Sequence, residues 1–369
     1  MDGHTRIREA QHWLSANASA PTVEVPGNSP GLVVPASSLA LSLRPLQPIL
    51  GRADVTEICI NRPGEAFIET RTGWTHEILP FADHAWCYRL AKLIANATRQ
   101  RITEESPLLS AALPTGERVQ IVIPPATSPG CVAISIRRPA AAVWSIRELA
   151  QGGVFKATRR AAESIDPIEQ ELLGLLAAND YEAFMSLAIR AKKNIVVSGA
   201  TGSGKTTFTK ALIREIPTDE RLITIEDAPE LVLQDHPNHV RLFYSKGDQG
   251  QAKVTPKQLL ESCLRMRPDR ILLAELRSDE AFDYLRNANS GHPGSITSVH
   301  ASSADLAFEQ LTLLVKQSRS GGDLPRPEIK TLLYLLVDIV VQFGVVGHQR
   351  CIQEVWYDPA RKRALASRT

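Results

Sequence analysis

One segment of this 369-residue chain combines residue types that bind phosphate. It reads Gly199-Ala200-Thr201-Gly202-Ser203-Gly204-Lys205-Thr206, with Thr207 following. Glycines let backbone N–H groups turn toward phosphate oxygens, the lysine reaches the outer phosphates, and the last threonine offers a hydroxyl to Mg²⁺. An apolar run at 195–198 precedes the segment and helical sequence follows at 207–215. This context favours a phosphate-binding loop between a strand and a helix over an ordinary glycine-rich turn.

Acidic residues follow two further apolar runs. Glu275 comes directly after 271–274, and Glu226 with Asp227 comes after 222–225. Carboxylates at the ends of strands next to a phosphate loop can hold Mg²⁺ and orient or deprotonate an attacking water. An acid in this position can instead cap the next helix, and for either glutamate alone that alternative stays open. Together with the loop, the two acids predict metal and water roles.

His300 ends the segment 291–300, in which a glycine-containing turn leads into a short β-like run. A single histidine in a strand is most often a hydrogen-bonded core residue. If 294–298 adds another strand to the same sheet, its end places an imidazole near a terminal phosphate. His300 is therefore a candidate for contact with that phosphate.

The elements that position these residues fall into two patterns. Beyond Lys193, strand and helix signals alternate, which predicts a parallel sheet with crossover helices. Before it, a hairpin (55–69), a helix (85–98) and two strands (117–123 and 131–137) predict a small α+β domain. We expect a mobile arm at 1–42, the α+β domain at 43–140, a mostly helical linker at 141–190 and the phosphate-binding domain at 191–369.

Composition excludes several classes of protein. Lys and Arg number 42 against 40 Asp and Glu, so the net charge of +2 argues against binding to nucleic acid through bulk charge. Five widely spaced cysteines form no CxxC pair for zinc and no disulfide framework. No secretory signal and no membrane-spanning run is evident, so we expect a cytoplasmic protein.

Four motifs in this order resemble the traffic ATPases shared by type II and type IV secretion. They are the phosphate loop, the acidic box 224–231, the segment 265–277 that ends in Glu275, Leu276 and Arg277, and the histidine box 291–301. Residues 55–65 and 113–118 look like the type IV secretion and conjugative-transfer branch. The resemblance covers about residues 43–360, and the missing tetracysteine insertion disfavours the type II branch.

The resemblance implies a RecA-like P-loop ATPase domain behind a smaller N-terminal domain. It implies that ATP binds between the two domains, that Lys205 and Thr206 hold phosphate and Mg²⁺, and that Glu226 and Glu275 share the metal and water roles. His300 would sense the γ-phosphate, and Arg118 and Arg137 would supply guanidinium groups to the triphosphate. For both arginines, a salt bridge on a strand is the open alternative. The long linker suggests that an N-terminal domain packs over a neighbour's nucleotide domain.

The resemblance further implies a ring of six subunits on the cytoplasmic face of the bacterial inner membrane. Its partners would be other type IV secretion ATPases and inner-membrane components, with peripheral membrane contact and no specific nucleic-acid site. The function we expect is an ATP-hydrolysing motor for pilus assembly and for transfer of DNA or protein. Two alternatives stay open: a P-loop translocase that pulls nucleic acid, and a nucleotide-controlled assembly scaffold with negligible turnover.

Overall fold

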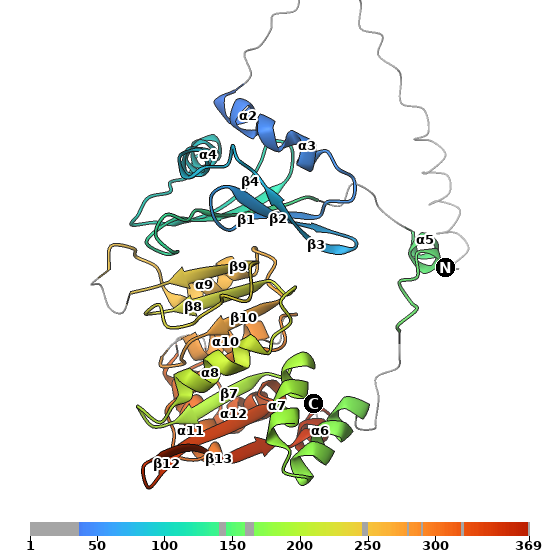
Figure 1. Ribbon diagram of the computed structural model, residues 1–369. Coiled ribbons are helices and arrows are strands. Elements are labelled where there is room, and N and C mark those ends of the chain that lie inside the picture. Colours follow the sequence, from blue (N-terminus) through green and yellow to red (C-terminus); the bar gives the residue numbers. More distant parts are fainter. Residues whose placement is uncertain are drawn as a thin grey trace, which may run out of the picture. The chain divides into compact units, whose positions relative to one another are not determined.

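The computed structural model describes residues 37–139, 145–158, 166–245, 250–278, 280–288, 291–318 and 321–367 (Figure 1). Residues 38–369 form one compact unit, and the following sections concern that unit. Most of the expected arm, residues 1–36, lies outside the described residues. Its end at residue 42 is wrong, because α2 (Ser38–Leu43) is already helical and buries Leu39 and Leu43 in the N-terminal core. A 3₁₀ turn (Arg44–Leu46) and α3 (Gln47–Leu50) continue it.

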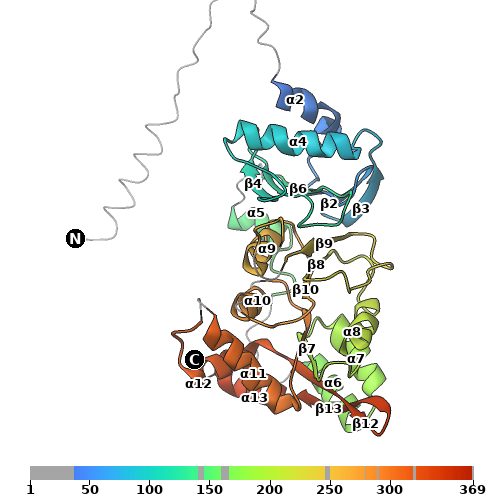
Figure 2. The same cartoon turned by 90° about the vertical axis from the view of Figure 1, so that its left-hand side faces the viewer.

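The N-terminal domain is a six-stranded antiparallel sheet covered by one long helix. The strands lie in the order β3-β2-β1-β6-β5-β4. Their bounds are β1 Glu57–Ile60, β2 Glu65–Thr70, β3 Gly73–Ile78, β4 Leu108–Ala112, β5 Arg118–Val122 and β6 Ala133–Arg137. Helix α4 (His84–Ala97) is capped by Asp83, whose carboxylate accepts from the Trp86 N–H, and Figure 2 shows it lying along the sheet. The predicted α+β domain is confirmed.

The strand register of this sheet separates an apolar face from a charged face. Ile58 lies opposite Ile68 and Ile136, and Val119 lies opposite Ile136; all four belong to the core that includes the buried face of α4. Because neighbouring residues of a strand point to opposite faces, the adjacent positions form a second row on the other face. That row, which we call the charged row, runs across five strands and contains Trp74, Glu69, Glu57, Arg137 and Arg118.

The C-terminal domain carries the predicted parallel strands in two groups. One group has the order β10-β8-β9, and the other has the order β11-β7-β12-β13, in which only β13 is antiparallel. The groups meet where Leu276 N–H donates to Ser298 O (2.9 Å). The strands are β7 Ile195–Gly199, β8 Leu222–Glu226, β9 His239–Phe243, β10 Arg270–Leu273, β11 Ile296–Val299, β12 Ile339–Val346 and β13 Gln349–Tyr357. The α/β fold class is confirmed.

Helices pack around this sheet, and two of them correct the predicted linker. These helices are α6 Pro167–Ala177, α7 Tyr181–Arg190, α8 Lys205–Arg214, α9 Pro256–Cys263, α10 Glu280–Ala288, α11 Ala304–Gln317, α12 Arg326–Leu336 and α13 Pro359–Ala366, whereas α5 (Ile146–Gln151) buries none of its residues. Leu172 of α6 and Phe184 of α7 are fully buried in the same core as Ile195 and Val197 of β7. The C-terminal domain therefore begins near Asp166 and not at residue 191.

The charged row of the N-terminal sheet contacts the C-terminal domain. Arg267 Nη2 donates to Glu69 Oε1 (2.6 Å), and the guanidinium of buried Arg221 lies over the Trp74 ring. Burial raises the pKa of Glu57 to about 7, although the charges of Arg221 and Arg137 act in the opposite direction. Trp74, Glu69 and Glu57 are thus the part of the charged row that is paired or buried. Among the described residues, no helix combines the length and hydrophobicity needed to cross a membrane.

Candidate functional site

The phosphate loop has the tight backbone that its glycines predict. It joins β7 to α8, and Gly202 and Gly204 adopt φ angles of 75° and 110°, a region that side chains with a Cβ rarely enter. At Gly199, an added Cβ would lie 2.7 Å from Phe343 O and from Ser203 Oγ. The loop ends at the amino terminus of α8, where free N–H groups and the helix dipole favour an anion. Thr206 and Thr207 are exposed in the first turn of that helix.

Lys205 lies folded against its own loop. Its Nζ donates to Gly199 O (2.6 Å) and Ala200 O (2.9 Å) and lies 3.3 Å from His300 Nδ1. Burial lowers the pKa of Lys205, while the nearby charge of Glu275 acts to raise it. Carbonyl groups are weaker partners for an ammonium group than phosphate oxygens. Lys205 can therefore exchange these carbonyls for the phosphates of a nucleotide.

Glu275 and His300 meet at the carboxyl edge of the sheet. Glu275 follows β10 and His300 follows β11, and Glu275 Oε1 lies 2.9 Å from His300 Nε2. The structure thus brings Lys205, His300 and Glu275 together, as the order of motifs suggested. A carboxylate here can accept a proton from water, and an imidazole can donate a hydrogen bond to a phosphate oxygen.

Arg277 joins this group, and the sequence motifs did not single it out. Its Nη2 donates to Glu275 Oε2 (2.5 Å) and its Nη1 to Asp227 Oδ2 (3.3 Å). The hydrogen bond to Glu275 raises the pKa of Arg277. The signal in the sequence was its spacing, because alternate residues of an extended segment point the same way. Arg277 therefore orients the carboxylate from the side opposite His300.

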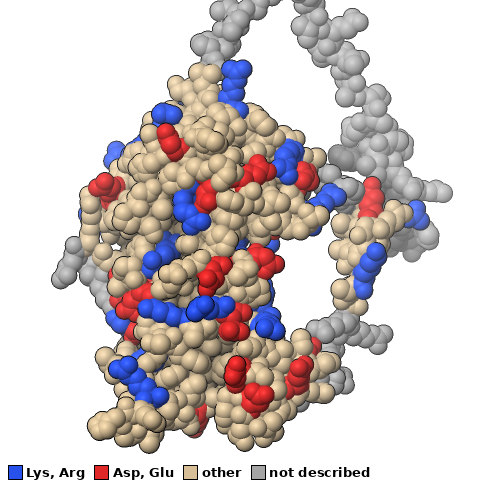
Figure 3. All heavy atoms as spheres, in the orientation of Figure 1, with Lys and Arg blue, Asp and Glu red and all other residues tan. Residues whose placement is uncertain are grey.

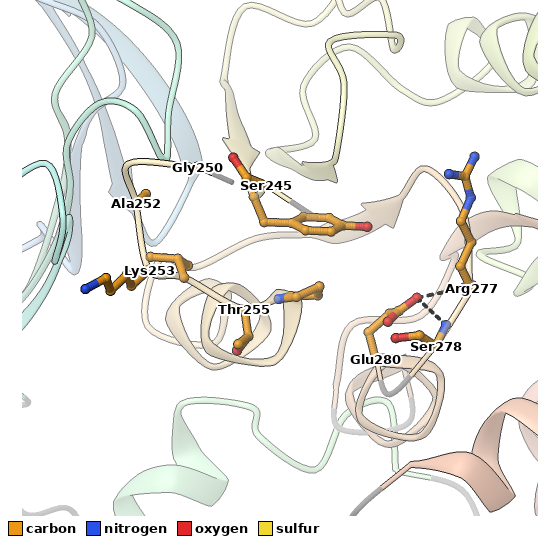
Figure 4. Close-up of a pocket in the computed structure, with 11 residues that line it drawn as sticks. Ser245, Gly250, Ala252, Lys253, Thr255, Arg277, Ser278 and Glu280 are labelled. Atoms are coloured by element: carbon orange, nitrogen blue, oxygen red, sulfur yellow. Dashed lines mark hydrogen bonds between the residues drawn. The ribbon is translucent and has the colours of Figure 1, made fainter. Parts of the chain in front are cut away.

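A cavity of about 720 Å³ adjoins Arg277 on this edge. It is lined by residues 244, 245, 250, 252–256, 277, 278 and 280. In Figure 4, Arg277 and Ser278 lie beside Glu280, and the Arg277 side chain extends away from it. Glu280 Oε1 accepts from the N–H groups of Arg277 and Ser278. These bonds fix the backbone that carries Arg277.

Glu226 differs from its predicted role. Its carboxylate is fully buried and accepts from the Thr224 hydroxyl (2.7 Å) and from the N–H groups of Glu230 and Leu231 (both 2.8 Å). Arg241 forms a bidentate pair with it, both distances being 3.0 Å. All acceptor directions are thus in use, so Glu226 holds the turn after β8 in place. A metal or water role for Glu226 would require this network to break.

The oxygen donors that remain suit Mg²⁺. Nucleotide sites bind this ion through one or two protein oxygens together with phosphates and water. The exposed hydroxyl of Thr206 at the start of α8 and the half-buried carboxylate of Glu275 are such donors. Of the predicted metal ligands Thr206, Glu226 and Glu275, the geometry favours the first and the last.

Arg118 and Arg137 lie together, away from the phosphate loop of their own chain. They are opposite one another on β5 and β6 and line a pocket of about 590 Å³ with Arg265. Arg265 follows α9 and precedes β10, so it lies at the amino edge of the parallel strands, opposite the carboxyl edge that carries Lys205. The pocket lining contains no acidic residue, and within the described residues neither Arg118 nor Arg137 forms an ion pair. We call this the arginine pocket.

Comparison with known proteins gives concordant matches. A family model described as "Type II/IV secretion system protein" matches residues 40–354. The type IV secretion system protein VirB11 of Brucella suis is 50% identical over 336 residues, which cover 90% of this chain and 93% of that relative. The type IV secretion system protein PtlH of Bordetella pertussis is 41% identical over 325 residues, covering 87% and 95%.

A solved structure matches over the same range. The crystal structure of the VirB11 ATPase from the Brucella suis type IV secretion system in complex with sulphate has a TM-score of 0.84 and 50% identity. The match covers 89% of this chain and 100% of that chain. The likeness therefore includes both domains and is not confined to the phosphate loop.

Proposed function

We propose, from the premise that this chain belongs to the type II/IV secretion system protein family, that six copies form a ring that hydrolyses ATP with Mg²⁺. The chain is an ATPase of the type IV secretion class. The observation that carries the proposal is the grouping of Lys205, Glu275 and His300 on one edge of the sheet. The work done by the ring is assembly of a pilus and transfer of a substrate through the secretion apparatus.

We call the carboxyl edge of the sheet, which carries Lys205, Glu275 and His300, the phosphate edge. Each side chain there has a separate task. Lys205 leaves the carbonyls of Gly199 and Ala200 and binds the outer phosphates, while the loop N–H groups hold the inner ones. Glu275 orients the attacking water and takes its proton, held in position by Arg277. His300 donates to the γ-phosphate. Mg²⁺, held by Thr206 and through Glu275, would neutralise charge that develops on the phosphates.

We place Arg118 and Arg137 at the nucleotide of a neighbouring copy. Three guanidinium groups in a pocket without acidic lining form a strong site for a triphosphate. The pocket is on the amino edge of its own sheet and the phosphate loop is on the carboxyl edge, so we infer that its arginines do not complete the phosphate site of their own copy. A ring solves this problem, because the arginine pocket of one copy faces the phosphate loop of the next. Closure onto ATP would then move one domain against another.

Mixing two inactive variants tests this arrangement. Lys205→Ala destroys the phosphate edge, whereas Arg118→Ala with Arg137→Ala destroys the arginine pocket. If the arginines act between copies, an equal mixture should regain activity at about one quarter of the interfaces. In a randomly mixed ring, about one neighbouring pair in four combines an intact phosphate loop with an intact arginine pocket. The matched control mixes Lys205→Ala with a variant that carries Lys205→Ala, Arg118→Ala and Arg137→Ala together. This mixture should stay inactive, because neither component has an intact phosphate loop. No recovery in the first mixture, with mixed rings demonstrated by mass measurement, would refute action between copies.

Phosphate release by the wild-type protein tests the motor itself. Negligible release would favour the assembly scaffold. DNA-stimulated hydrolysis with a steep salt dependence would favour the nucleic-acid translocase. No observation supports that translocase here, since Lys and Arg alternate with Asp and Glu on the face in Figure 3.

Location and partners are proposed from the family alone. We place the ring on the cytoplasmic face of the inner membrane, in contact with other type IV secretion ATPases and inner-membrane components. Cell fractionation followed by crosslinking is the direct test. Recovery of the protein without membranes or secretion components would contradict the placement.

A further inference from the structure

The hairpin formed by β12 and β13 lies against the phosphate loop. Phe343 of β12 is in parallel register with Gly199, and its ring packs 4.9 Å from that of Phe208 in α8. A Cβ at Gly204 would lie 3.4 Å from Arg350 Cδ and 3.8 Å from Phe343 Cδ1. Arg350, the second residue of β13, therefore lies directly on the loop that binds phosphate.

The guanidinium of Arg350 has no partner among the described residues. Arg350 is exposed, lies opposite Val345 in the hairpin and makes no hydrogen bond or ion pair with that part of the chain. Other arginines near the site differ, since Arg241 pairs with Glu226 and Arg277 pairs with Glu275. An unpaired cation held by its aliphatic stem against a phosphate loop is suited to an anionic ligand.

Sheet order fixes which part of a nucleotide lies near Arg350. The group β11-β7-β12 places His300 on one side of the phosphate loop and the hairpin on the other. Glu275 also lies on the His300 side, so the terminal phosphate must point there. The remainder of the nucleotide then extends across the amino terminus of α8 toward the hairpin. Arg350 therefore faces the α-phosphate and ribose end.

We propose that Arg350 binds the α-phosphate end of the nucleotide and positions it in the loop. This inference rests on the proposed function, because it takes the loop to be a nucleotide site. The guanidinium donates hydrogen bonds to oxygens that ATP and ADP share. Arg350 therefore strengthens binding of both nucleotides equally, whereas the arginine pocket acts on the terminal phosphate and distinguishes ATP from ADP.

Equilibrium binding of ADP and of a non-hydrolysable ATP analogue tests the proposal. Arg350→Ala should weaken both by about tenfold or more, the effect of losing one hydrogen bond to a charged group. Arg350→Met keeps the stem over Gly204 but removes the charge, and it should weaken both nucleotides to the same extent. Arg350→Lys should recover part of the affinity.

The matched control is Gln349→Ala, one residue along the same strand and directed to the other face. It should leave both affinities within twofold of wild type. Thermal unfolding without nucleotide should change by no more than about 2 °C in Arg350→Met, as for other exposed substitutions. Wild-type affinity in Arg350→Met would overturn the proposal and leave only a packing role for the stem. A loss for the ATP analogue but not for ADP would overturn it as well.

The outcome is separable from failure of the proposed function. If the loop does not bind nucleotide, wild type and Lys205→Ala will both fail to bind ADP. If the loop binds nucleotide but Arg350 does not take part, Lys205→Ala will lose ADP and the Arg350 variants will keep it.

Discussion

The phosphate edge and the arginine pocket differ in how their charges are balanced. At the phosphate edge, Glu275 is paired with His300 and Arg277, and Lys205 is bonded to carbonyls of its own loop. In the arginine pocket, three guanidinium groups line one cavity without an acid. The charges of the first region are balanced within the chain, whereas the second offers three exposed guanidinium groups to an anion. This difference is what we expect if the two regions are complementary parts of one site, as proposed above.

The largest expected effect tests whether the phosphate edge depends on its one buried cation. Lys205→Ala should reduce ATP hydrolysis at least about a hundredfold, because no other group can replace the ammonium at the outer phosphates. Phosphate release measures this loss. Lys210→Ala, in the same helix, is the matched control and should hydrolyse ATP at nearly the wild-type rate. Substantial hydrolysis by Lys205→Ala would show that the edge does not carry the chemistry.

A second prediction separates the two glutamates of that edge. Glu275→Gln should lower kcat by about 10² or more while nucleotide still binds, because it removes the base but keeps an amide oxygen that can face Mg²⁺. Glu226→Gln should instead lower the free energy of unfolding by about 3 kcal/mol, since it breaks a buried pair with Arg241. Chemical denaturation and single-turnover hydrolysis together measure both effects. Equal catalytic loss in two equally stable variants would restore a shared catalytic role.

The smallest expected effect concerns Glu57, which lies beside Arg137 in the charged row. Because burial raises its pKa to about 7, the folded protein binds this proton more tightly than the unfolded chain. Its stabilising effect is complete below about pH 4.5 and is lost as the pH rises through about 7. We expect a loss of about 2 kcal/mol between pH 5 and pH 8.

Glu57→Gln should remove that part of the pH dependence, as measured by denaturant unfolding at each pH. Glu182→Gln, at an exposed position of α7, is the control and should keep the wild-type profile. An unchanged profile in Glu57→Gln would mean that the carboxyl group stays ionised at this contact. The negative charge of Glu57 would then be balanced by the nearby charges of Arg221 and Arg137.

The sequence was most informative where function depends on local spacing. The phosphate loop, the strands before Glu226 and Glu275, and the strand before His300 all lie where their apolar runs predicted. Parallel strands bring their carboxyl ends to one edge, so the meeting of Lys205, Glu275 and His300 followed from topology.

Features that depend on distant partners were not predictable in this way. The bidentate partner of Glu226 is Arg241 on the next strand, and no local pattern marks that pair. Helices α6 and α7 look like a linker because no local pattern shows which domain their apolar residues pack against. Only packing against β7 makes Leu172 and Phe184 part of the core. The strands β3 and β4 were not predicted, because most of their positions are exposed or half-buried and their apolar and polar residues do not alternate clearly.

The charged row also determines which changes in chain length the site can tolerate. Arg118 and Arg137 are brought together by pairing between β5 and β6, not by a fixed number of residues between them. Removing a single residue within β6 would reverse the faces of the residues that follow, so that Arg137 would point at α4 and Arg138 would take its position in the charged row. Removing two residues would keep the faces but put Pro139 at that position. The arginine pocket thus depends on the register of β6, a constraint that no search for a contiguous motif would detect.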